Sequence, residues 1–223
     1  MRLWFLLLLL APGAAFAGYQ DREAGITLGQ EIVLGSQSSH FADSPAFYAY
    51  FYRRYDLLYA WGLELGRSIG HTNRGHLSTQ ELGDIDSPAD GKPDTLNFKS
   101  AVKTTVTRLT PQFKIGKSDE DAPGGFRPYA ILGGGLYLIQ NKAGAATLSS
   151  FTTGGVNAAT APLTAQISKR NEFDLGFNLG VGFTAKWASS LEVAGDLRYH
   201  YVFLHGGATL YLLTPGAKFN FLF

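Results

Sequence analysis

The sequence predicts an all-β protein, a transmembrane antiparallel up-and-down β-barrel of eight strands with short periplasmic turns and longer extracellular loops. Three observations lead to this prediction. An export signal opens the chain, the segments after it alternate between apolar and polar residues, and their connections alternate between short and long. No stretch after the signal resembles a transmembrane helix. A closed barrel is the other structure that satisfies every backbone group within lipid, so strands would have to cross the membrane.

The composition excludes several other classes of protein. The chain has 223 residues, of which 17% are charged, and this value is too low for a highly charged disordered chain. The absence of Cys excludes a disulfide scaffold, a CxxC redox site and a thiolate zinc site. A formal net charge of +1 implies no basic surface for nucleic acid, so we expect no nucleic-acid partner.

Residues 1–17 have the three parts of a secretory signal peptide. Arg2 supplies the positive charge, Leu3 to Ala11 form the apolar run, and Ala15-Phe16-Ala17 is a small-x-small cleavage site. The apolar run is too short to span a bilayer, which needs about 20 residues. We therefore expect a cleaved signal peptide at 1–17 and a barrel domain at 18–223. An uncleaved N-terminal anchor is the alternative.

Residues 173–187 show the cleanest alternation of apolar and polar side chains. Every odd position is apolar, from Phe173 to Trp187, and every even position is small, polar or charged. This period of two is typical of a strand with one apolar face. Three further segments repeat the pattern: 191–203, 211–223 and 57–65. We expect their apolar faces to contact lipid and their polar faces to line the barrel interior.

Four other segments alternate less cleanly and complete the predicted eight strands: 24–35, 46–54, 98–115 and 126–140. In the third of these, Val102 and Val106 fall on one face, whereas Leu109 and Phe113 fall on the other. A β-bulge would switch the face between the two pairs, and Pro111 favours a bulge at this place.

The connections between the predicted strands alternate in length. Long polar stretches at 70–97 and 141–170 alternate with tighter turns such as Tyr55-Asp56 and Ala188-Ser189-Ser190. Outer-membrane barrels have this layout, with the long loops outside and the short turns in the periplasm. An even number of strands also brings both ends of the barrel domain to the periplasmic side.

Aromatic side chains are expected at both ends of the strands, where a barrel meets the two membrane interfaces. The candidates for the periplasmic girdle are Tyr52, Tyr55, Tyr59, Trp61, Phe126, Tyr129, Trp187, Phe219, Phe221 and Phe223. The candidates for the outer girdle are Phe47, Tyr137, Tyr199, Tyr201, Phe203 and Tyr211. A soluble lipocalin-like barrel, the inverted alternative, would turn its apolar residues inward around a ligand. The glycines and charges on the opposing faces favour lipid outside.

Three segments resemble the OmpA/OmpX/OmpW-type family of eight-stranded outer-membrane barrels. FRPYAILGGGLY at 126–137 resembles the family's fifth strand, 175–199 resembles its penultimate hairpin, and the terminal Phe223 after alternating aromatics resembles its last strand. The resemblance implies an outer-membrane location in a Gram-negative-type envelope, in contact with outer-membrane lipid and lipopolysaccharide. It also implies that the barrel-assembly machinery reads a C-terminal signal, formed here by Phe219, Phe221 and Phe223.

Seven charged residues are predicted to point into the lumen: Glu64, Asp174, Lys186, Glu192, Asp196, Arg198 and Lys218. The interior of an eight-stranded barrel is about wide enough for its own side chains. We interpret these charges as a paired, hydrogen-bonded plug that satisfies buried charge. The alternative is a narrow polar path for small solutes, whose selectivity these residues would set.

The five histidines lie toward the predicted outer side: His40, His71, His76, His200 and His205. His71 and His76 share a predicted loop with three carboxylates, Glu81, Asp84 and Asp86. These are ligand types for zinc or copper, but their spacing matches no recognised site. We therefore expect no metal and no cofactor.

His76-Leu77-Ser78 near Glu81 suggests an esterase-like triad, as in outer-membrane lipid A deacylases. Those enzymes place the triad on rigid strands, whereas these residues fall in a predicted loop, and adjacency in sequence does not establish triad geometry. We therefore expect no enzymatic activity, and a lipid-modifying enzyme remains a distant alternative.

Two main hypotheses for function follow. The first is a structural or surface-interaction scaffold, whose loops 70–97 and 141–170 offer binding surfaces to an extracellular ligand on a rigid barrel. The second is a narrow porin-like channel for small solutes. Conductance across a planar bilayer distinguishes them.

Overall fold

The computed structural model describes residues 22–39, 41–55, 58–78, 95–116, 125–153, 156–158, 164–188, 190–205 and 207–223. The predicted signal peptide, His40, Glu81, Asp84 and Asp86 lie outside these residues. Within the described ranges, no helix is long and apolar enough to cross a membrane.

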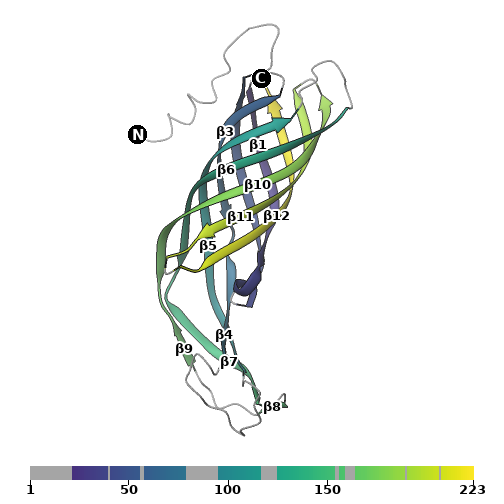
Figure 1. The fold of residues 1–223 in the computed structure, drawn as a ribbon. Helices are drawn as coiled ribbons and strands as arrows, with labels where there is room; N and C mark the ends of the chain where they lie inside the picture. Colours follow the sequence, from purple (N-terminus) through teal and green to yellow (C-terminus); the bar gives the residue numbers. More distant parts are fainter. Residues whose placement is uncertain are drawn as a thin grey trace, which may run out of the picture.

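Eight strands form a closed antiparallel ring (Figure 1). Their bounds are β1 Arg22–Leu34, β2 Ser44–Arg54, β3 Tyr59–Ser68, β5 Thr95–Gly116, β6 Phe126–Asn141, β10 Arg170–Ala188, β11 Leu191–Phe203 and β12 Thr209–Leu222. Each pairs with the strands before and after it in this series, and β12 pairs with β1. The predicted eight-stranded barrel is confirmed, and its closure leaves the ring without an open edge.

The ring closes between its first and last strands. Glu23 lies opposite Leu222, and Arg22 and Phe223 exchange two backbone hydrogen bonds of 3.1 and 3.0 Å. We call this end of the barrel, with Arg22 and Phe223, the inner end. The opposite end, from which additional strands extend in Figure 1, is the outer end.

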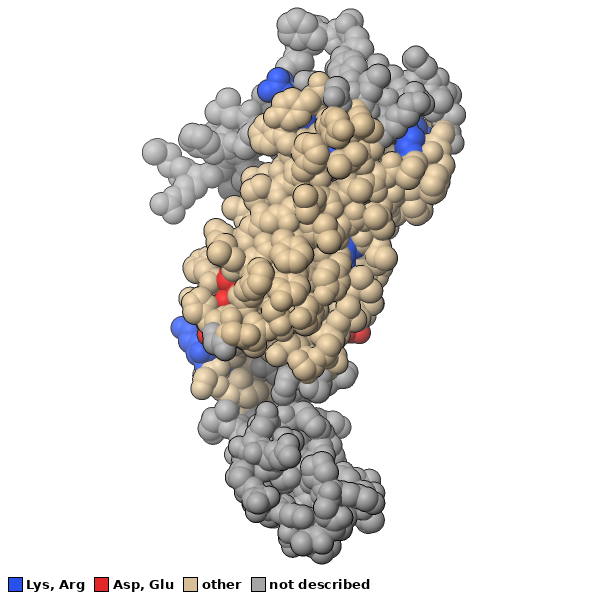
Figure 2. All heavy atoms as spheres, in the orientation of Figure 1, with Lys and Arg blue, Asp and Glu red and all other residues tan. Residues whose placement is uncertain are grey.

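The outward faces of the strands form an apolar belt. On β10, the odd-numbered side chains predicted to contact lipid are exposed, with Leu179 at 49% and Val181 at 59%, whereas Asp174 and Asn178 are buried. Figure 2 shows that most charged side chains visible on this face lie toward the two ends of the barrel. An apolar surface this extensive is suited to lipid rather than to water.

Strand β5 lacks the bulge that was predicted near Pro111. Its register against β6 runs unbroken from Thr104 to Gly116, and Pro111 stays in register with Leu63 of β3. Val106 points inward and is 2% exposed. It belongs to a cluster of apolar side chains that fills the barrel interior at the outer end. The prediction was wrong because the inner face of β5 is apolar at its outer end. In the sequence, apolar residues that change from one parity to the other look the same as a bulge that switches the faces.

The connections predicted as loops at 70–97 and 141–170 contain strands. These are β4 His71–Ser78, β7 Gly144–Thr153, β8 Val156–Ala158 and β9 Thr164–Ile167. Strand β5 is 22 residues long and continues beyond the barrel, where it pairs with β4 on one side and β7 on the other. We call the extension made by β4, the first part of β5, β7, β8 and β9 the outer sheet (Figure 1).

Most of the predicted girdle aromatics lie on the outer surface, but three tyrosines point into the barrel. Tyr52 and Tyr137 are 0% exposed and Tyr129 is 6% exposed. Their hydroxyl groups hydrogen-bond to polar side chains of the interior, Tyr52 to Gln112, for example. The assignment to the girdles was wrong for these three, because a tyrosine serves an interface and a polar interior equally well.

Candidate functional site

Six of the seven predicted lumen charges are buried inside the barrel: Glu64, Asp174, Glu192, Asp196, Arg198 and Lys218. The seventh, Lys186, is half-buried near the inner end of β10. The structure brings Glu64, Asp196, Arg198 and Lys218 into one group. Asp174 lies apart, at the outer end.

Arg198 is the centre of this group. Asp196 and Arg198 are two residues apart on β11 and therefore share its inner face. The Arg198 guanidinium bonds to Glu64 of β3 across the lumen, and its Nε lies 2.9 Å from Asp196 Oδ2. Lys218 of β12 places its Nζ 2.7 Å from the same Asp196 oxygen. Two cations and two carboxylates thus neutralise one another inside the barrel, where all four side chains are shielded from bulk water.

A second group lies beside the first and was missed in the sequence. Arg108 Nη1 donates to Glu31 Oε1 at 2.7 Å, and its Nε lies 3.8 Å from Glu64 Oε1. The Arg108 guanidinium also lies 4.0 Å from the centre of the Tyr48 ring. His71 Nε2 lies 2.9 Å from Glu31 Oε2. The two groups therefore form one network of ion pairs across the barrel, joined at Glu64.

The inner end holds further ion pairs. Lys114 Nζ lies 2.7 Å from Glu23 Oε2, and Arg54 Nη2 approaches the same oxygen at 3.6 Å. Arg127 bonds to Glu192. Lys114 also lies 4.7 Å from the centre of the Tyr129 ring. These side chains come from strands around the ring, so they cross-brace the barrel at this end.

The outer end of the lumen is closed by apolar side chains. We call this cluster the outer plug: Val33, Val106, Tyr137, Ile139, Val202, Leu204, Leu210 and Leu212. The cavity among these side chains has a volume of about 10 Å³. A cavity of this size is at the lower limit for a single water molecule. The outer plug therefore leaves little space between its side chains at this cavity.

Of the candidate metal ligands considered in the sequence, His71 is the one whose side chain the structure describes. His71 faces the barrel interior, where its Nδ1 lies 2.8 Å from the Ala42 carbonyl oxygen and its Nε2 is bonded to Glu31. The backbone of His76 lies in β4, and the predicted carboxylate partners lie outside the described residues. The side chain of His71, the first residue of β4, is thus part of the lumen network.

Another cluster of ligand-type residues was not predicted. Glu172, Asp174 and His205 place their ligand atoms within 4.8 Å of one another. Arg170 Nη2 lies 2.7 Å from Glu172 Oε2, however, and His205 Nδ1 lies 2.7 Å from Asp174 Oδ1. A guanidinium already occupies the position that a cation would need, so this cluster is an ion pair at the outer end.

The suggested triad falls partly on a strand, contrary to the expectation of a loop. The backbones of His76 and Ser78 both belong to β4. Glu81 lies outside the described residues, so the triad hypothesis stays a prediction. The strand was missed because residues 71–78 lack the alternation of apolar and polar residues by which the barrel strands were recognised.

The closed ring, the apolar belt and the paired interior together define the fold of an eight-stranded outer-membrane barrel. No protein-family model matches the sequence, and no curated protein matches it. The chain is similar to the crystal structure of Neisserial surface protein A, with a TM-score of 0.50 and 11% identity over 92% of this chain and 98% of that one.

Two further solved structures are similar to a lower degree. The N-terminal β-barrel domain of OprF from Pseudomonas aeruginosa has a TM-score of 0.43 and 14% identity over 91% of this chain and 98% of its own. The outer membrane protease OmpT from Escherichia coli has a TM-score of 0.39 and 10% identity over 94% of this chain and 99% of its own. The fold is what this chain shares with such proteins, and none of them assigns it an activity.

Proposed function

We propose that the chain is an integral outer-membrane protein whose closed barrel is a scaffold for surface interactions. The observation that carries this proposal is the filled interior. Arg108 and Arg198 are each 1% exposed and are paired with carboxylates on other strands. Removing one partner of a buried ion pair is strongly destabilising, so these pairs hold the barrel in a single arrangement.

The outer plug favours a scaffold over the channel hypothesis. A solute path would have to pass between Val106, Ile139 and Leu212, which are all at most 2% exposed. Ions would lose their hydration there, and of the side chains that line the cavity only His71, Thr104 and Arg170 offer polar groups to replace it. The ion-pair network fills the middle of the lumen, and the apolar outer plug adds a second obstacle to conduction.

The outer sheet supplies the surface that such a scaffold would present. Strand β5 runs without interruption from Thr95 outside the barrel to Gly116 at its inner end. Its pairing with β4 and β7 continues the barrel wall outward as a sheet. Binding residues on a sheet that is continuous with a rigid barrel need less ordering on binding than residues on free loops. We infer that an extracellular ligand binds here.

The proposal includes an assembly route. Phe219, Phe221 and Phe223 alternate along the outward face of β12 and are 37%, 54% and 41% exposed. A row of aromatic side chains on the last strand would be accessible to the barrel-assembly machinery before the ring closes. The predicted C-terminal signal therefore remains part of the proposed function.

Planar-bilayer recording of the purified, refolded protein tests the scaffold proposal. We expect no steady single-channel current from the wild-type protein. A steady current that disappears on substitution of Arg198 would overturn the proposal in favour of a channel.

A matched pair of variants shows that the assay can detect opening. Leu212→Ala removes volume from the outer plug, whereas Leu213→Ala makes the same chemical change on the outward face of β12. Brief openings in the first variant alone would locate the seal at the outer plug. Measurable currents of equal size from wild type and both variants would show that the plug does not seal the barrel.

A further inference from the structure

The barrel wall breaks at one level as it passes into the outer sheet. β3 gives way to β4 at 69–70, β6 to β7 at 142–143, and β9 to β10 at 168–169. Strand β5 continues through this level, which we call the rim. An open groove lies at this level of the wall.

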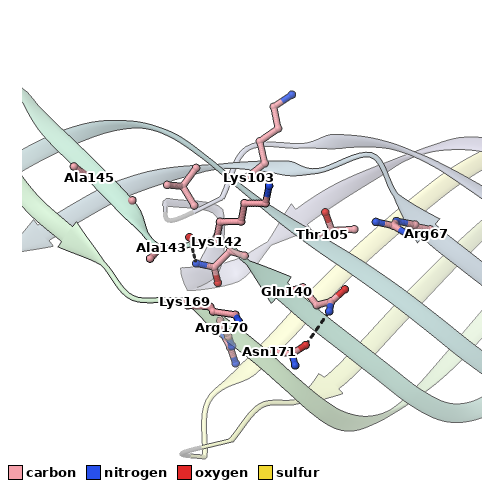
Figure 3. A pocket seen from close by; sticks show the side chains of 13 residues that line it. Arg67, Lys103, Thr105, Gln140, Lys142, Ala143, Ala145, Lys169, Arg170 and Asn171 are labelled. Atoms are coloured by element: carbon pink, nitrogen blue, oxygen red, sulfur yellow. Dashed lines mark hydrogen bonds between the residues drawn. The ribbon is translucent and has the colours of Figure 1, made fainter.

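This rim groove has a volume of about 780 Å³ and is lined by residues of β3, β5, β6, β7 and β10 and their connections (Figure 3). Four of its lining residues are exposed cations: Arg67, Lys103, Lys142 and Lys169. Gln140 and Asn171 lie among them and hydrogen-bond to each other at 2.8 Å, as Figure 3 shows. The lining is therefore rich in hydrogen-bond donors.

No carboxylate lines the groove. Arg170 also lines it, but its guanidinium is bonded to Glu172 at 2.7 Å. Over the described part of the chain, no ion pair joins the other four cations to a carboxylate. The buried cations Arg108, Arg198 and Lys218 are, in contrast, paired with carboxylates. A cluster of four uncompensated cations repels itself, and an anion that binds between them would relieve this repulsion.

The groove lies where the apolar belt ends. On β10, Phe173 is 63% exposed and Asn171, two residues toward the rim, lines the groove. On β3, Leu65 is 55% exposed and Arg67, again two residues on, is a groove cation. Two residues of a strand span about 7 Å. The cations therefore lie about two residues beyond the end of the apolar belt, at the depth expected for lipid headgroups.

The strand registers place three groove side chains in one row, since Thr105 pairs with Gln140 and Gln140 pairs with Asn171. Arg67 pairs with Thr107, so it lies two residues from this row. The row crosses β5, β6 and β10 on the outward face of the barrel, with Arg67 of β3 beside it. A ligand in it would lie against the wall, with any acyl chains directed along the apolar belt and its charged groups among the cations.

We propose that the rim groove binds the phosphate groups of a phosphorylated glycolipid in the outer leaflet. This inference rests on the proposed outer-membrane location. Lys and Arg form strong, charge-assisted hydrogen bonds to phosphate oxygens. The depth of the groove selects a lipid over a soluble anion, because a soluble anion gains nothing from the apolar wall just below.

Native mass spectrometry of the refolded, detergent-solubilised protein tests the proposal with diphosphorylated lipid A as the probe. We expect wild type to retain this lipid, and the Lys142→Gln/Lys169→Gln variant to bind it about tenfold more weakly. Lipid A without phosphates should bind wild type as weakly as the diphosphorylated form binds the variant. The matched control is Arg22→Gln/Arg53→Gln, which removes two exposed cations at the inner end and should bind like wild type.

Several outcomes would overturn the inference. Equal binding of the phosphorylated and dephosphorylated lipids would remove the role of phosphate. Equal losses in the groove and control variants would reduce the effect to net charge. Competition by inorganic pyrophosphate or a soluble sulfated polysaccharide at the concentration of the lipid would identify a soluble polyanion site. The heat-dependent shift of folded barrels in gel electrophoresis, measured for each variant, separates these results from a failure of the barrel fold itself.

Discussion

Arg108 and Glu31 meet inside the barrel through a hydrogen bond of 2.7 Å, although β5 and β1 are not neighbours in the ring. Both side chains are 1% exposed. Their contact spans the lumen and joins opposite parts of the wall. Arg108→Met should leave Glu31 and Glu64 without this cation and lower the free energy of unfolding by about 3–5 kcal/mol.

Urea unfolding from lipid vesicles measures this change. The double variant Arg108→Met/Glu31→Gln should lose less stability than the sum of its single variants, because each single change leaves a buried charge behind. Strictly additive losses would show that the two residues do not interact in the folded protein.

The depth of a substitution on the lipid face should set its cost. Leu179→Arg, near the middle of β10, should destabilise the barrel by about 2–4 kcal/mol, whereas Phe173→Arg, near the rim, should cost about 0–1 kcal/mol. Both side chains point outward, so the same unfolding experiment compares the same new group at two depths. Equal costs at the two sites would contradict the placement of the apolar belt.

Glycines on the inner face make room for the large interior side chains. A Cβ atom at Gly66 would lie 2.2 Å from Cδ1 of Tyr48, whereas one at the outward-facing Gly134 would meet no atom closer than 3.4 Å. Gly66→Ala should therefore cost about 1–3 kcal/mol through overpacking. Gly134→Ala is the control, and its effect on unfolding should stay within about 0.5 kcal/mol. A neutral Gly66→Ala variant would mean that the Tyr48 ring can move freely.

The orientation of the barrel can be measured by labelling, since the chain has no Cys. Ala143→Cys is exposed at the rim and should react with a bulky, membrane-impermeant maleimide on intact cells. Ser190→Cys is exposed between β10 and β11 at the inner end and should react only after the outer membrane is permeabilised. The reverse pattern would invert the proposed orientation.

The proposed C-terminal signal predicts a difference between assembly in cells and refolding in vitro. Phe223→Ala should lower the amount of folded barrel in cells, while refolding into detergent stays close to that of wild type. Phe203→Ala, which removes a similarly exposed aromatic from β11, is the control and should assemble normally. If both variants assemble equally well, Phe223 is not read as a signal.

The lipid-facing parts of the fold could be predicted from the sequence, because a strand in contact with lipid needs an apolar side chain at every second position. Leu179 and Trp61, for example, are apolar and exposed, and their side chains were assigned to the correct face of the barrel wall. The interior follows a weaker rule. Val106 is apolar and Arg108 is charged, yet they are neighbours on one inner face. This mixture hid Arg108 and led to a bulge being expected where there is none.

The lumen network illustrates what a single sequence leaves open. Glu64, Asp196, Arg198 and Lys218 were predicted to share the interior, but nothing in their spacing shows that Arg198 bonds across the lumen to Glu64. Such contacts depend on the width and tilt of the closed barrel. The outer sheet was missed for a different reason, because segments such as 71–78 and 144–153 show no apolar period.

The pairing of β1 with β12 has a consequence for how the barrel is built. The two strands that form this seam stand at opposite ends of the described sequence, so the ring stays open until its final strand arrives. Until then, β1 carries a row of unmatched amide and carbonyl groups that hydrocarbon does not solvate. Insertion into the membrane and pairing of β1 with β12 should therefore occur together. Otherwise an edge strand of an assembly factor should pair with β1 until β12 replaces it.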